Sequence, residues 1–465
     1  MPKVGFVSLG CAKNLVDTEV MMGLLAHGGY ELTPRAGEAE VLVVNTCSFI
    51  DPAKKESVDA ILEMAEWKRS GSARRLVVAG CLVERYRDQI RKEIPEVDAV
   101  IGTNEVERIV SACGEGPAGL PRALSVLEPY LYHEATPRIL STPPHTAYVK
   151  ITEGCDHPCS FCIIPKLRGP FRSRRLESVV AEAKGLLARG VREINLIGQD
   201  TTSYGQDLGI NDGLPLLLER LASAVADRGA GWIRFLYSYP NRITPRLLDT
   251  VAAFPALVRY LDIPLQHASG RILKRMRRGQ NGDQFLKLLE RIRRAVPGVA
   301  IRTSMIVGFP GETEAGFEEL CRFVEAAQFD RLGVFAYSDE EGTPSYELDG
   351  KLDARTIHNR RRRLMALQRK ISQRKNRALV GRTCDLLFEG VSRETELLWE
   401  GRLPTQAPEI DGKVLVNDLE GAPPEPGSFV RVRITEALDY DLIGKIVPGE
   451  QRERAALCRP AATAR

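Results

Sequence analysis

Short β-branched apolar runs alternate with amphipathic stretches along most of this chain of 465 residues. In the first hundred residues, such runs occupy positions 3–10, 40–47, 75–81 and 97–102, with helical stretches between them. Strands that alternate with helices predict a parallel sheet, because each parallel crossover needs a connection about as long as a helix. The sequence therefore predicts an α/β domain over residues 1–113.

A second series of strand–helix units follows a stretch rich in proline and glycine, residues 114–140, which is predicted to be a linker. Six strand–helix units predict a partial (β/α)6 barrel, short of the eight units of a full TIM barrel. A long basic helix ends this domain, which we expect over residues 141–376. The apolar runs of the series lie at residues 147–154, 192–200, 232–240, 259–267, 300–311 and 331–339.

After the basic helix the hydrophobic periodicity changes. Residues 377–447 contain short strand-like runs separated by glycine and proline turns, which predicts a small all-β barrel. Residues 448–465 are polar and rich in alanine and arginine, so we expect a flexible tail. The predicted fold is a multidomain α/β chain with a parallel-sheet domain, a partial TIM barrel and a small β-barrel.

Composition excludes several classes of protein. Hydrophobic residues make up 43% and charged residues 27% of the chain, which is ordinary for a globular protein and excludes a disordered or fibrous one. The opening MPKVGFVSLG resembles a buried strand and not a signal peptide, and no apolar run approaches the roughly 18 residues of a membrane span. We therefore expect a cytoplasmic protein without membrane association. Ten cysteines are too sparse for a secreted disulfide framework, so clustered thiols indicate metal binding or catalysis.

The loop GCDHPCSFC at 154–162 crowds three cysteines into a polar segment: Cys155, Cys159 and Cys162. A four-iron cluster normally takes four thiolates, so three leave one iron open to a small molecule. The loop directly follows the first predicted core strand, at the carboxyl-terminal face where barrel enzymes place their chemistry. The spacing therefore predicts a [4Fe–4S] cluster with one open iron.

A structural zinc site is the alternative for this loop. Zinc prefers a closed set of four ligands, commonly two C-x2-C pairs. His157 could supply a fourth ligand, but it lies between two of the cysteines, where closing a tetrahedron strains the loop. Buried thiols without chemistry are a weaker alternative, because the residues between the cysteines are polar.

Three further cysteines each end a predicted strand of the first domain: Cys11, Cys47 and Cys81, named here the auxiliary triad. The carboxyl ends of parallel strands share one edge of a sheet, so these thiols can converge although they are distant in sequence. The adjoining Gly10 and Gly80 allow close backbone approach. A single cysteine at a strand end is usually a small buried hydrophobe. Three in successive strands, upstream of the loop at 154–162, predict a second cluster.

The C-x3-C-x2-C loop, with the aromatic Phe161 before its last cysteine, resembles the radical S-adenosylmethionine (SAM) superfamily. Residues 154–163 are therefore named the SAM loop, and Cys155, Cys159 and Cys162 the SAM triad. The resemblance implies that the open iron chelates SAM. An electron from the cluster would then split SAM into methionine and a 5′-deoxyadenosyl radical, which removes hydrogen from an unactivated C–H bond. The protein's part would be to position the cofactor and to exclude water.

With both triads and the small C-terminal barrel, the chain resembles the methylthiotransferases over nearly its whole length; that barrel is known there as the TRAM domain. The resemblance implies two [4Fe–4S] clusters and two SAM molecules per turnover. One SAM supplies the methyl group carried on sulfur, and the second generates the radical. A low-potential electron donor such as flavodoxin or ferredoxin is also implied. The implied cluster ligands are Cys11, Cys47 and Cys81 for the auxiliary cluster, and Cys155, Cys159 and Cys162 for the SAM cluster.

Two turns at predicted strand ends are candidate SAM contacts. Gln199 and Asp200 follow the second core strand, and the turn from Gly308 to Gly311 follows the fifth. The two glycines permit close backbone approach, and the turn leads into a helix amino terminus with spare N–H donors. In the superfamily both strand ends approach SAM, whereas a plain strand-to-helix turn is the alternative reading.

The fourth core strand ends in Gln266 and His267. Both would face the opening at the carboxyl-terminal end of the barrel, called its mouth, toward which the two turns also point. Gln266 is therefore another candidate SAM contact. For His267 a general-base role is possible, but a hydrogen-bonded structural role is the prediction. Cys113, Cys321, Cys384 and Cys458 are assigned no chemistry.

Two branches of the methylthiotransferase family differ in substrate. One modifies an adenosine beside the anticodon of transfer RNA, carrying an isopentenyl or threonylcarbamoyl group. The other modifies the β-carbon of an aspartate in protein twelve of the small ribosomal subunit. SLGCAKNLVDTE at 8–19 resembles the protein-modifying branch, whereas the transfer RNA branch has a sequence more like GCQMN. The segment 152–174, especially Lys166–Pro170, is also close to the protein-modifying branch, although both branches share much of it.

Charge supports the same branch. Residues 377–447 carry 13 acidic and 8 basic residues, a balance of −5. An RNA-docking barrel should be basic, whereas an acidic one suits a basic ribosomal protein. The alternative is that these carboxylates keep the barrel surface hydrated, or pair with the protein's own basic helix, without binding a partner. The basic run Arg360–Arg363 favours the transfer RNA branch, because it could contact RNA. It could equally contact ribosomal RNA beside a protein target.

The sequence thus favours an enzyme that methylthiolates the ribosomal protein. An iron–sulfur electron carrier or scaffold remains as an alternative of a different class. A pure carrier would saturate its iron with cysteine, whereas both triads are one thiolate short of four.

Overall fold

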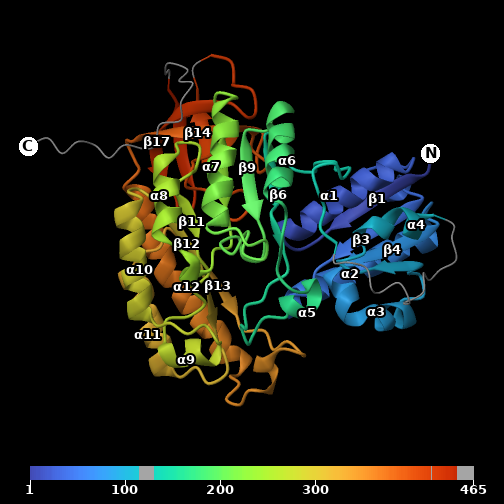
Figure 1. Ribbon diagram of the computed structural model, residues 1–465, viewed down its shortest axis with the longest axis horizontal. Coiled ribbons are helices and arrows are strands. Elements are labelled where there is room, and N and C mark those ends of the chain that lie inside the picture. Colours follow the sequence, from blue (N-terminus) through green and yellow to red (C-terminus); the bar gives the residue numbers. More distant parts are fainter. Residues whose placement is uncertain (115–129, 420, 448–465) are drawn as a thin grey trace, which may run out of the picture.

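The computed structural model describes residues 1–114, 130–419 and 421–447. Figure 1 shows an N-terminal domain in blue, a large central domain from green to orange, and a red β-barrel packed against the end of the central domain. The predicted tail, Cys458 and most of the predicted linker lie outside the described residues. None of the helices in the described ranges combines the length and the apolar character needed to cross a membrane.

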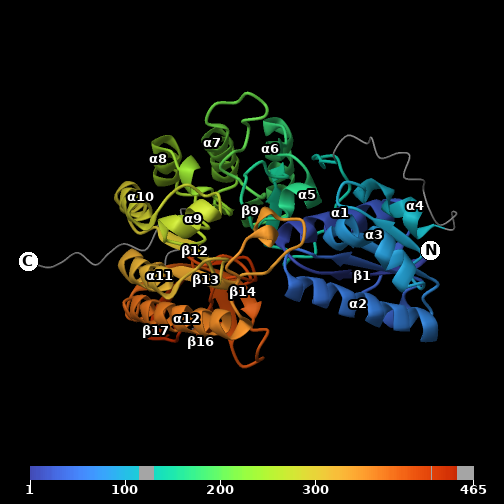
Figure 2. The same cartoon turned by 90° about the horizontal axis from the view of Figure 1, so that it is seen from below.

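The N-terminal domain is built on a five-stranded sheet in the order β2-β1-β3-β4-β5, with every neighbouring pair parallel. Helices cover both faces: α1 and α4 pack on the face of Val43 and Val77, and α2 and α3 on the face of Leu42 and Val78. Figure 2 shows α1 and α2 on opposite sides of this sheet. The elements are β1 (Lys3–Ser8), α1 (Ala12–His27), β2 (Glu31–Leu32), η1 (Ala36–Glu38), β3 (Val41–Thr46), α2 (Asp51–Ser70), β4 (Arg75–Gly80), α3 (Cys81–Glu93), β5 (Ala99–Ile101), η2 (Val106–Arg108) and α4 (Ile109–Cys113).

The predicted parallel sheet is confirmed, because the apolar runs of the sequence form β1, β3, β4 and β5. Strand β3 is buried along all six residues, as expected for a central strand covered on both faces. Strand β2 was not predicted, since its two residues are too few to show a hydrophobic period.

The central domain, called the core here, contains six parallel strands in two three-stranded sheets, β10-β9-β6 and β11-β12-β13. The sheets meet at a bridge between Ile233 and Leu257, and the Ser238 N–H donates to the Asp262 carbonyl at 2.9 Å. The elements are β6 (Thr146–Lys150), β7 (Thr152–Glu153), α5 (Ile164–Arg168), β8 (Arg172–Ser173), α6 (Leu176–Ala188), β9 (Glu193–Ile197), α7 (Gly213–Ala226), β10 (Trp232–Phe235), η4 (Pro240–Arg242), α8 (Pro245–Ala253), β11 (Tyr260–Asp262), α9 (Gly270–Arg275), α10 (Gly282–Ala295), β12 (Ala300–Val307), α11 (Glu314–Ala327), β13 (Arg331–Ala336), η5 (Pro344–Glu347) and α12 (Ala354–Arg377).

The core agrees with the partial barrel predicted from the sequence. Each of its parallel strands arises from one of the predicted apolar runs, and an extensive apolar cluster forms between the strands and the surrounding helices. The basic helix α12 buries Leu364 and Ile371 in that cluster, which accounts for the apolar stripe in an otherwise charged segment.

The C-terminal domain is a closed barrel in the order β14-β15-β16-β18-β17, as the change in periodicity predicts. Its pairs are antiparallel except β16 with β18, which run parallel. Apolar side chains such as Leu386, Val416 and Val432 fill its centre. The strands are β14 (Thr383–Val391), β15 (Trp399–Arg402), β16 (Val414–Asp418), β17 (Phe429–Ala437) and β18 (Leu442–Ile446).

The small barrel packs against the amino-terminal ends of the core strands. Glu193, at the start of β9, is fully buried and accepts from Arg402 Nη2 of the barrel at 2.5 Å and from Arg234 Nη2 of β10 at 3.0 Å. Tyr260, at the start of β11, donates its hydroxyl to Asp411 Oδ2 at 2.7 Å. These contacts fix the barrel at the end of the core opposite to the carboxyl ends of the strands.

Ion pairs also join the N-terminal domain to the core. Glu340, which is 1% exposed, accepts from Arg85 Nη1 at 2.6 Å and from Lys54 Nζ at 2.9 Å. Arg138, in the segment between the domains, donates to Glu19 Oε2 of α1 at 2.5 Å and to Glu182 Oε1 of α6 at 2.7 Å. The carboxyl-terminal edges of the two domains are thereby held against each other.

Candidate functional site at the junction of two thiol triads

The auxiliary triad lies at the carboxyl-terminal edge of the N-terminal sheet. Cys11, Cys47 and Cys81 follow β1, β3 and β4, which are neighbours in the sheet. Gly10 is required there, because its φ is +89° and a Cβ would lie 2.8 Å from the Cys47 Cβ. The structure thus brings together the three cysteines that the strand ends predicted, although 70 residues of chain separate the first from the last.

The thiols of this triad are close enough to influence each other's ionisation. Burial raises the pKa of Cys81 to about 12; Arg168 opposes that rise, whereas Cys11 and Cys47 add to it. The pKa of Cys11 is lowered, because the positive charges of Lys13 and Arg168 outweigh the effect of burial. The edge therefore presents three sulfur ligands beside two fixed cations, which suits a group that binds thiolates.

The SAM triad occupies a tight loop directly after β7. Gly154 has a φ of +77°, and a Cβ on it would lie 2.1 Å from the Pro170 carbonyl oxygen. The loop is fixed by hydrogen bonds from Cys155 N to the Gly169 carbonyl at 3.2 Å and from Ser160 N to the Met276 carbonyl at 3.1 Å. Burial, together with the neighbouring Cys159 and Cys155, raises the pKa of Cys162 to about 12. The structure thus also gathers the second set of predicted cysteines.

His157, the potential fourth ligand of the zinc alternative, is engaged elsewhere. Its Nε2 lies 2.6 Å from Asp200 Oδ2, and its ring stacks on Tyr239 with centroids 3.7 Å apart. In the part of the chain that the structure describes, no group of three or more His, Cys, Asp or Glu side chains, either thiol triad included, is arranged to hold a single metal ion. The zinc alternative therefore lacks its fourth ligand.

The two triads lie close to each other across the domain junction. Cys81 of the auxiliary triad packs against Ile163 and Leu167, which follow Cys162 in the SAM loop and helix α5. Thr103 Oγ1 donates to the Leu167 carbonyl at 2.7 Å. Both sets of thiols therefore border one region, between the carboxyl-terminal edges of the two domains.

A buried ionic network supports this region, and the sequence analysis missed it. Arg168, 1% exposed, donates to Asp17 Oδ2 at 3.0 Å and to Glu153 Oε1 at 3.1 Å. Lys150 Nζ lies 2.5 Å from carboxylate oxygens of the same two residues. Burial acts to raise the pKa of Glu153, but Arg168 and Lys150 outweigh burial and lower it. Two cations and two carboxylates thus balance across the junction.

Gln199, one of the predicted SAM contacts, is hydrogen-bonded to this network. Gln199 Nε2 donates to Glu153 Oε1 at 2.8 Å, while its buried Oε1 has no hydrogen-bond partner among the described residues. A buried amide oxygen without a donor is uncommon and remains available to a ligand. The predicted contact between Gln199 and SAM stays a prediction with this observation in its favour.

Asp200 lies in the same turn but is occupied by its neighbours. Its carboxylate bonds His157 Nε2 and accepts from Ser203 Oγ at 2.6 Å and from Thr202 N at 2.8 Å. Burial acts to raise its pKa, but these hydrogen bonds, His157 first, lower it. Asp200 therefore fixes the imidazole within the SAM loop, and a direct contact between Asp200 and SAM stays a prediction.

Gly308 and Gly311 have the positive φ values, +80° and +82°, that make glycine necessary. A Cβ on Gly308 would lie 2.4 Å from Ile357 of α12, and one on Gly311 would lie 3.2 Å from the Arg275 guanidinium. The close approach that the sequence indicated therefore includes protein neighbours. Contact of this turn with SAM stays a prediction.

Gln266 and His267 end the segment after β11. Gln266 has a φ of +74°, unusual for a residue with a side chain, and bridges Met305 of β12. His267 is fully buried: its Nδ1 accepts from Ser269 N at 3.0 Å, and its Nε2 lies 3.3 Å from Glu312 Oε2. These contacts agree with the structural role predicted for His267.

Arg278 is a further residue that the sequence did not single out. Its Nη1 lies 3.5 Å from Cys159 Sγ, and its guanidinium stacks on the Tyr239 ring at 4.4 Å. The same ring stacks on His157 from the SAM loop. Arg278, Tyr239 and His157 together form one wall beside the SAM triad. Neither spacing nor periodicity could have indicated Arg278, because it follows a short helix more than a hundred residues later.

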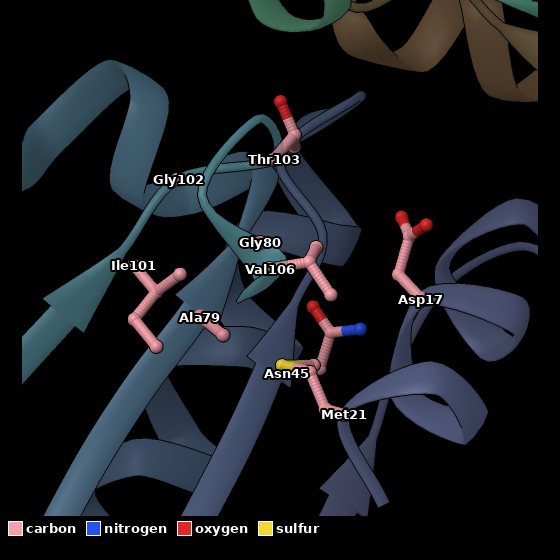
Figure 3. Close-up of a pocket in the computed structure, with 9 residues that line it drawn as sticks. All are labelled: Asp17, Met21, Asn45, Ala79, Gly80, Ile101, Gly102, Thr103 and Val106. Carbon is pink, nitrogen blue, oxygen red and sulfur yellow. The ribbon is translucent and has the colours of Figure 1, made fainter. Parts of the chain in front are cut away.

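A small cavity of about 10 Å³ lies in the N-terminal domain near the auxiliary triad. Figure 3 shows Asp17, Asn45 and Thr103 around it, together with Gly80 beside Cys81. This volume holds about one water molecule, and the polar side chains could bond it. The cavity is a packing feature behind the triad and is too small for a cofactor.

By residue type, the donor set of each triad fits an iron–sulfur cluster. Each triad offers three thiols at a buried edge, with a cation close to a sulfur: Lys13 and Arg168 at the auxiliary triad, and Arg278 at the SAM triad. Thiolates are the usual protein ligands of such clusters, and positive groups near the sulfurs favour the thiolate form. Three thiols per site leave one coordination position of a four-iron cluster for a small molecule.

Three known families match successive parts of the chain. Residues 3–102 match the uncharacterized protein family UPF0004, residues 149–324 match the radical SAM superfamily, and residues 380–447 match the TRAM domain. These segments coincide with the N-terminal domain, the core and the small barrel.

Curated relatives match almost the full length. The ribosomal protein uS12 methylthiotransferase RimO of Solibacter usitatus is 65% identical, covering 96% of this chain and 95% of the relative. The protein of the same name from Koribacter versatilis is 56% identical, covering 96% of each chain. Among solved structures, the radical SAM methyltransferase TsrM from Kitasatospora setae, with cobalamin and a [4Fe–4S] cluster bound, shares the fold at a TM-score of 0.54. It is 17% identical and covers 74% of this chain and 77% of its own.

Identity at this level, over nearly the whole length and across all three domains, shows the family. The chain belongs to the RimO family of radical SAM methylthiotransferases.

Proposed function

We propose that this enzyme transfers a methylthio group to the β-carbon of an aspartate in ribosomal protein uS12. The two curated relatives named above are uS12 methylthiotransferases, and each is more than half identical to this chain. The proposal extends their named substrate to this protein and specifies the acceptor carbon.

The observation that carries the proposal is the meeting of two thiol triads at one domain junction, where Cys81 packs against the SAM loop at Ile163. We propose that Cys11, Cys47 and Cys81 hold an auxiliary [4Fe–4S] cluster and that Cys155, Cys159 and Cys162 hold the SAM cluster, with two SAM molecules used per turnover. When bound, the SAM cluster supplies the electron that cleaves SAM to a radical able to remove hydrogen from a C–H bond. An electron carrier would need neither an iron without a cysteine ligand nor two thiol triads close to each other.

The chain's own residues orient and enclose this chemistry. The turn of the SAM loop is fixed by Asp200 through His157, and Arg278 lies against Cys159. The buried network of Arg168, Asp17 and Glu153 pairs its charges beside the triads, so these side chains are held in fixed positions there. The unpartnered amide oxygen of Gln199 is the strongest of the candidate SAM contacts, ahead of Asp200, Gly308, Gly311 and Gln266.

Surface charge favours a protein substrate over transfer RNA. Within the described part of the barrel, exposed carboxylates outnumber exposed cations, and many basic side chains are paired internally, such as Arg431 with Asp385. Two arginines of the basic helix are also neutralised, since Arg360 pairs with Glu312 and Arg363 with glutamates of α11. We propose that the acidic barrel docks a basic ribosomal protein. The exposed carboxylates are Glu394, Glu396, Glu409, Asp418, Glu425 and Glu436.

Two further partners belong to the proposal. Cleavage of SAM needs a low-potential electron donor, such as a flavodoxin or ferredoxin. The exposed part of α12, for example Arg362, is available for contact with ribosomal RNA beside the protein target.

The test compares small ribosomal subunits and transfer RNA from cells with and without the gene. Mass spectrometry is expected to find the methylthio mass gain on a uS12 aspartate only when the gene is present. Purified enzyme reconstituted without oxygen is expected to contain about eight irons per chain, as two four-iron clusters require. A mass gain on transfer RNA adenosine, with none on uS12, would reverse the substrate assignment.

A further inference from the structure

Lys13 places a cation over the mouth of the core. It is the second residue of α1, two positions after Cys11, and it is only 8% exposed. Its Nζ lies 3.5 Å from the centroid of the Tyr237 ring, which belongs to the core. Tyr237 follows β10 with a φ of +64°, and its N–H donates to Asp262 Oδ2 at 3.0 Å. An ammonium of the N-terminal domain thus reaches across the junction to the carboxyl ends of the core strands.

Lys13 differs from the other buried cations of this junction. Lys150 and Arg168 share Asp17 and Glu153, and Arg138 pairs with Glu19. By contrast, no carboxylate in the described ranges forms an ion pair with Lys13, whose ammonium lies near the Tyr237 side chain, the Cys11 thiol and the Arg168 guanidinium. A cation–π contact offsets only part of the cost of burying a charge. A buried ammonium without a carboxylate partner is therefore a candidate for binding an anionic group that arrives from outside.

We propose that Lys13 binds the side-chain carboxylate of the target aspartate, an inference that rests on the proposed function. The β-carbon of aspartate is bonded directly to its carboxylate carbon, so an ammonium that fixes the carboxylate also fixes the reacting carbon. Because Lys13 lies two residues from Cys11 and against Tyr237, the β-carbon would be held between the auxiliary triad and the mouth of the core. Lys13 would then both select a carboxylate side chain and position its neighbouring carbon.

A simpler role for Lys13 would be to offset the negative charge of the auxiliary thiolates. That role predicts an equal effect on every substrate, because the thiolates are present whichever protein binds. Recognition of a carboxylate predicts an effect that depends on the substrate's charge. The two roles are therefore separated by changing the enzyme and the substrate together.

The experiment measures dissociation constants of the full-length reconstituted enzyme for labelled uS12 by fluorescence anisotropy. Two substrates are compared, wild-type uS12 and uS12 with the target aspartate changed to asparagine. The enzyme variants are Lys13→Met, which removes the charge, and Lys13→Arg, which keeps it. Lys55→Met, on the exposed face of α2, is the matched control and is expected to bind both proteins as the wild type does.

Wild-type enzyme is expected to bind the asparagine protein at least tenfold more weakly, the loss typical of one charge-assisted hydrogen bond. Lys13→Met should weaken binding of wild-type uS12 by a similar factor and leave binding of the asparagine protein within about twofold. Lys13→Arg should recover part of the affinity. The comparison of the two substrates on wild-type enzyme does not depend on how Lys13→Met folds.

Equal weakening of both proteins by Lys13→Met, or equal affinity of the wild-type enzyme for both, would overturn the assignment of Lys13. In the same preparations, mass spectrometry of wild-type uS12 after turnover tests the proposed function separately. Absence of the methylthio group there would overturn the proposed function and this inference with it, whereas its presence with equal affinities would overturn this inference alone.

Discussion

Replacing Glu193 with glutamine removes a negative charge that lies between two buried arginines, Arg234 of the core and Arg402 of the small barrel. Arg402 keeps its second carboxylate partner, Glu389, in the variant. Burial acts to raise the pKa of Glu193, but the two arginines outweigh burial and lower it from 4.5 to about 2. That difference corresponds to about 3 kcal/mol of stabilisation at neutral pH, similar to the cost of breaking a buried ion pair. We expect Glu193→Gln to weaken the attachment of the barrel to the core by this amount.

The assay is hydrogen exchange of the full-length protein followed by mass spectrometry. About 3 kcal/mol corresponds to roughly 100-fold less protection for amides whose exchange requires the barrel to separate from the core, as in residues 403–411. Because the folded pKa of Glu193 is below the unfolded value, its stabilisation is complete above about pH 4.5 and is lost as the pH falls toward 2. The wild type at low pH should therefore approach the variant.

Glu290→Gln is the matched control, because Glu290 and Arg294 form an exposed pair worth less than about 1 kcal/mol. Its exchange pattern is expected to match the wild type. Unchanged protection of residues 403–411 in Glu193→Gln, or an equal change in both variants, would refute the argument that the buried carboxylate holds the barrel in place.

Three further predictions concern the junction. Cys159→Ala should abolish 5′-deoxyadenosine formation, because the SAM loop then has two thiols instead of three, whereas Cys321→Ala on α11 should not. Cys47→Ala should retain SAM cleavage and stop sulfur insertion into uS12; simultaneous loss of both would contradict separate roles for the triads. Glu340→Gln leaves Arg85 and Lys54 without their shared carboxylate, so amides of 338–343 should lose protection equivalent to about 3 kcal/mol, as measured by hydrogen exchange.

The parts of the fold that the sequence predicted are those that depend on local pattern. Continuous apolar runs, separated by helices, locate β3 and β9 directly, because a strand buried on both faces needs consecutive apolar residues. The auxiliary triad was predictable for a topological reason: the carboxyl ends of neighbouring parallel strands share an edge. The SAM triad lies in one loop, so its members are close in any fold.

The contacts that the sequence could not predict join residues far apart in the chain. Arg168 meets Asp17, which lies 151 residues earlier, and Arg402 meets Glu193 at a separation of 209 residues. No local period marks such partners, because a charged residue in a strand or helix usually faces solvent. The surroundings of Lys13 could not be predicted either, because they depend on how the core packs against α1.

Glycine positions were only partly informative. Their positive φ was predictable at Gly308 and Gly311, but the neighbours that a side chain would strike were not. In the structure those neighbours include Ile357 and Arg275, so the same turn that was predicted to approach SAM also makes room for α12 and α9. A glycine in the sequence indicates a position where the backbone can adopt a positive φ or be approached closely. It does not identify the group that approaches the backbone there.

The position of the small barrel sets a minimum size for whatever it helps to recruit. It covers the amino ends of the core strands, whereas the thiols lie beyond the carboxyl ends, and β9 alone has five residues, about 16 Å in length. A molecule that touches the barrel and is modified at the thiols must therefore span at least this distance along the outside of the enzyme. A short peptide could occupy the thiol site without touching the barrel. We therefore expect the enzyme to modify short peptides at a normal maximal rate, but to become saturated only at high peptide concentration.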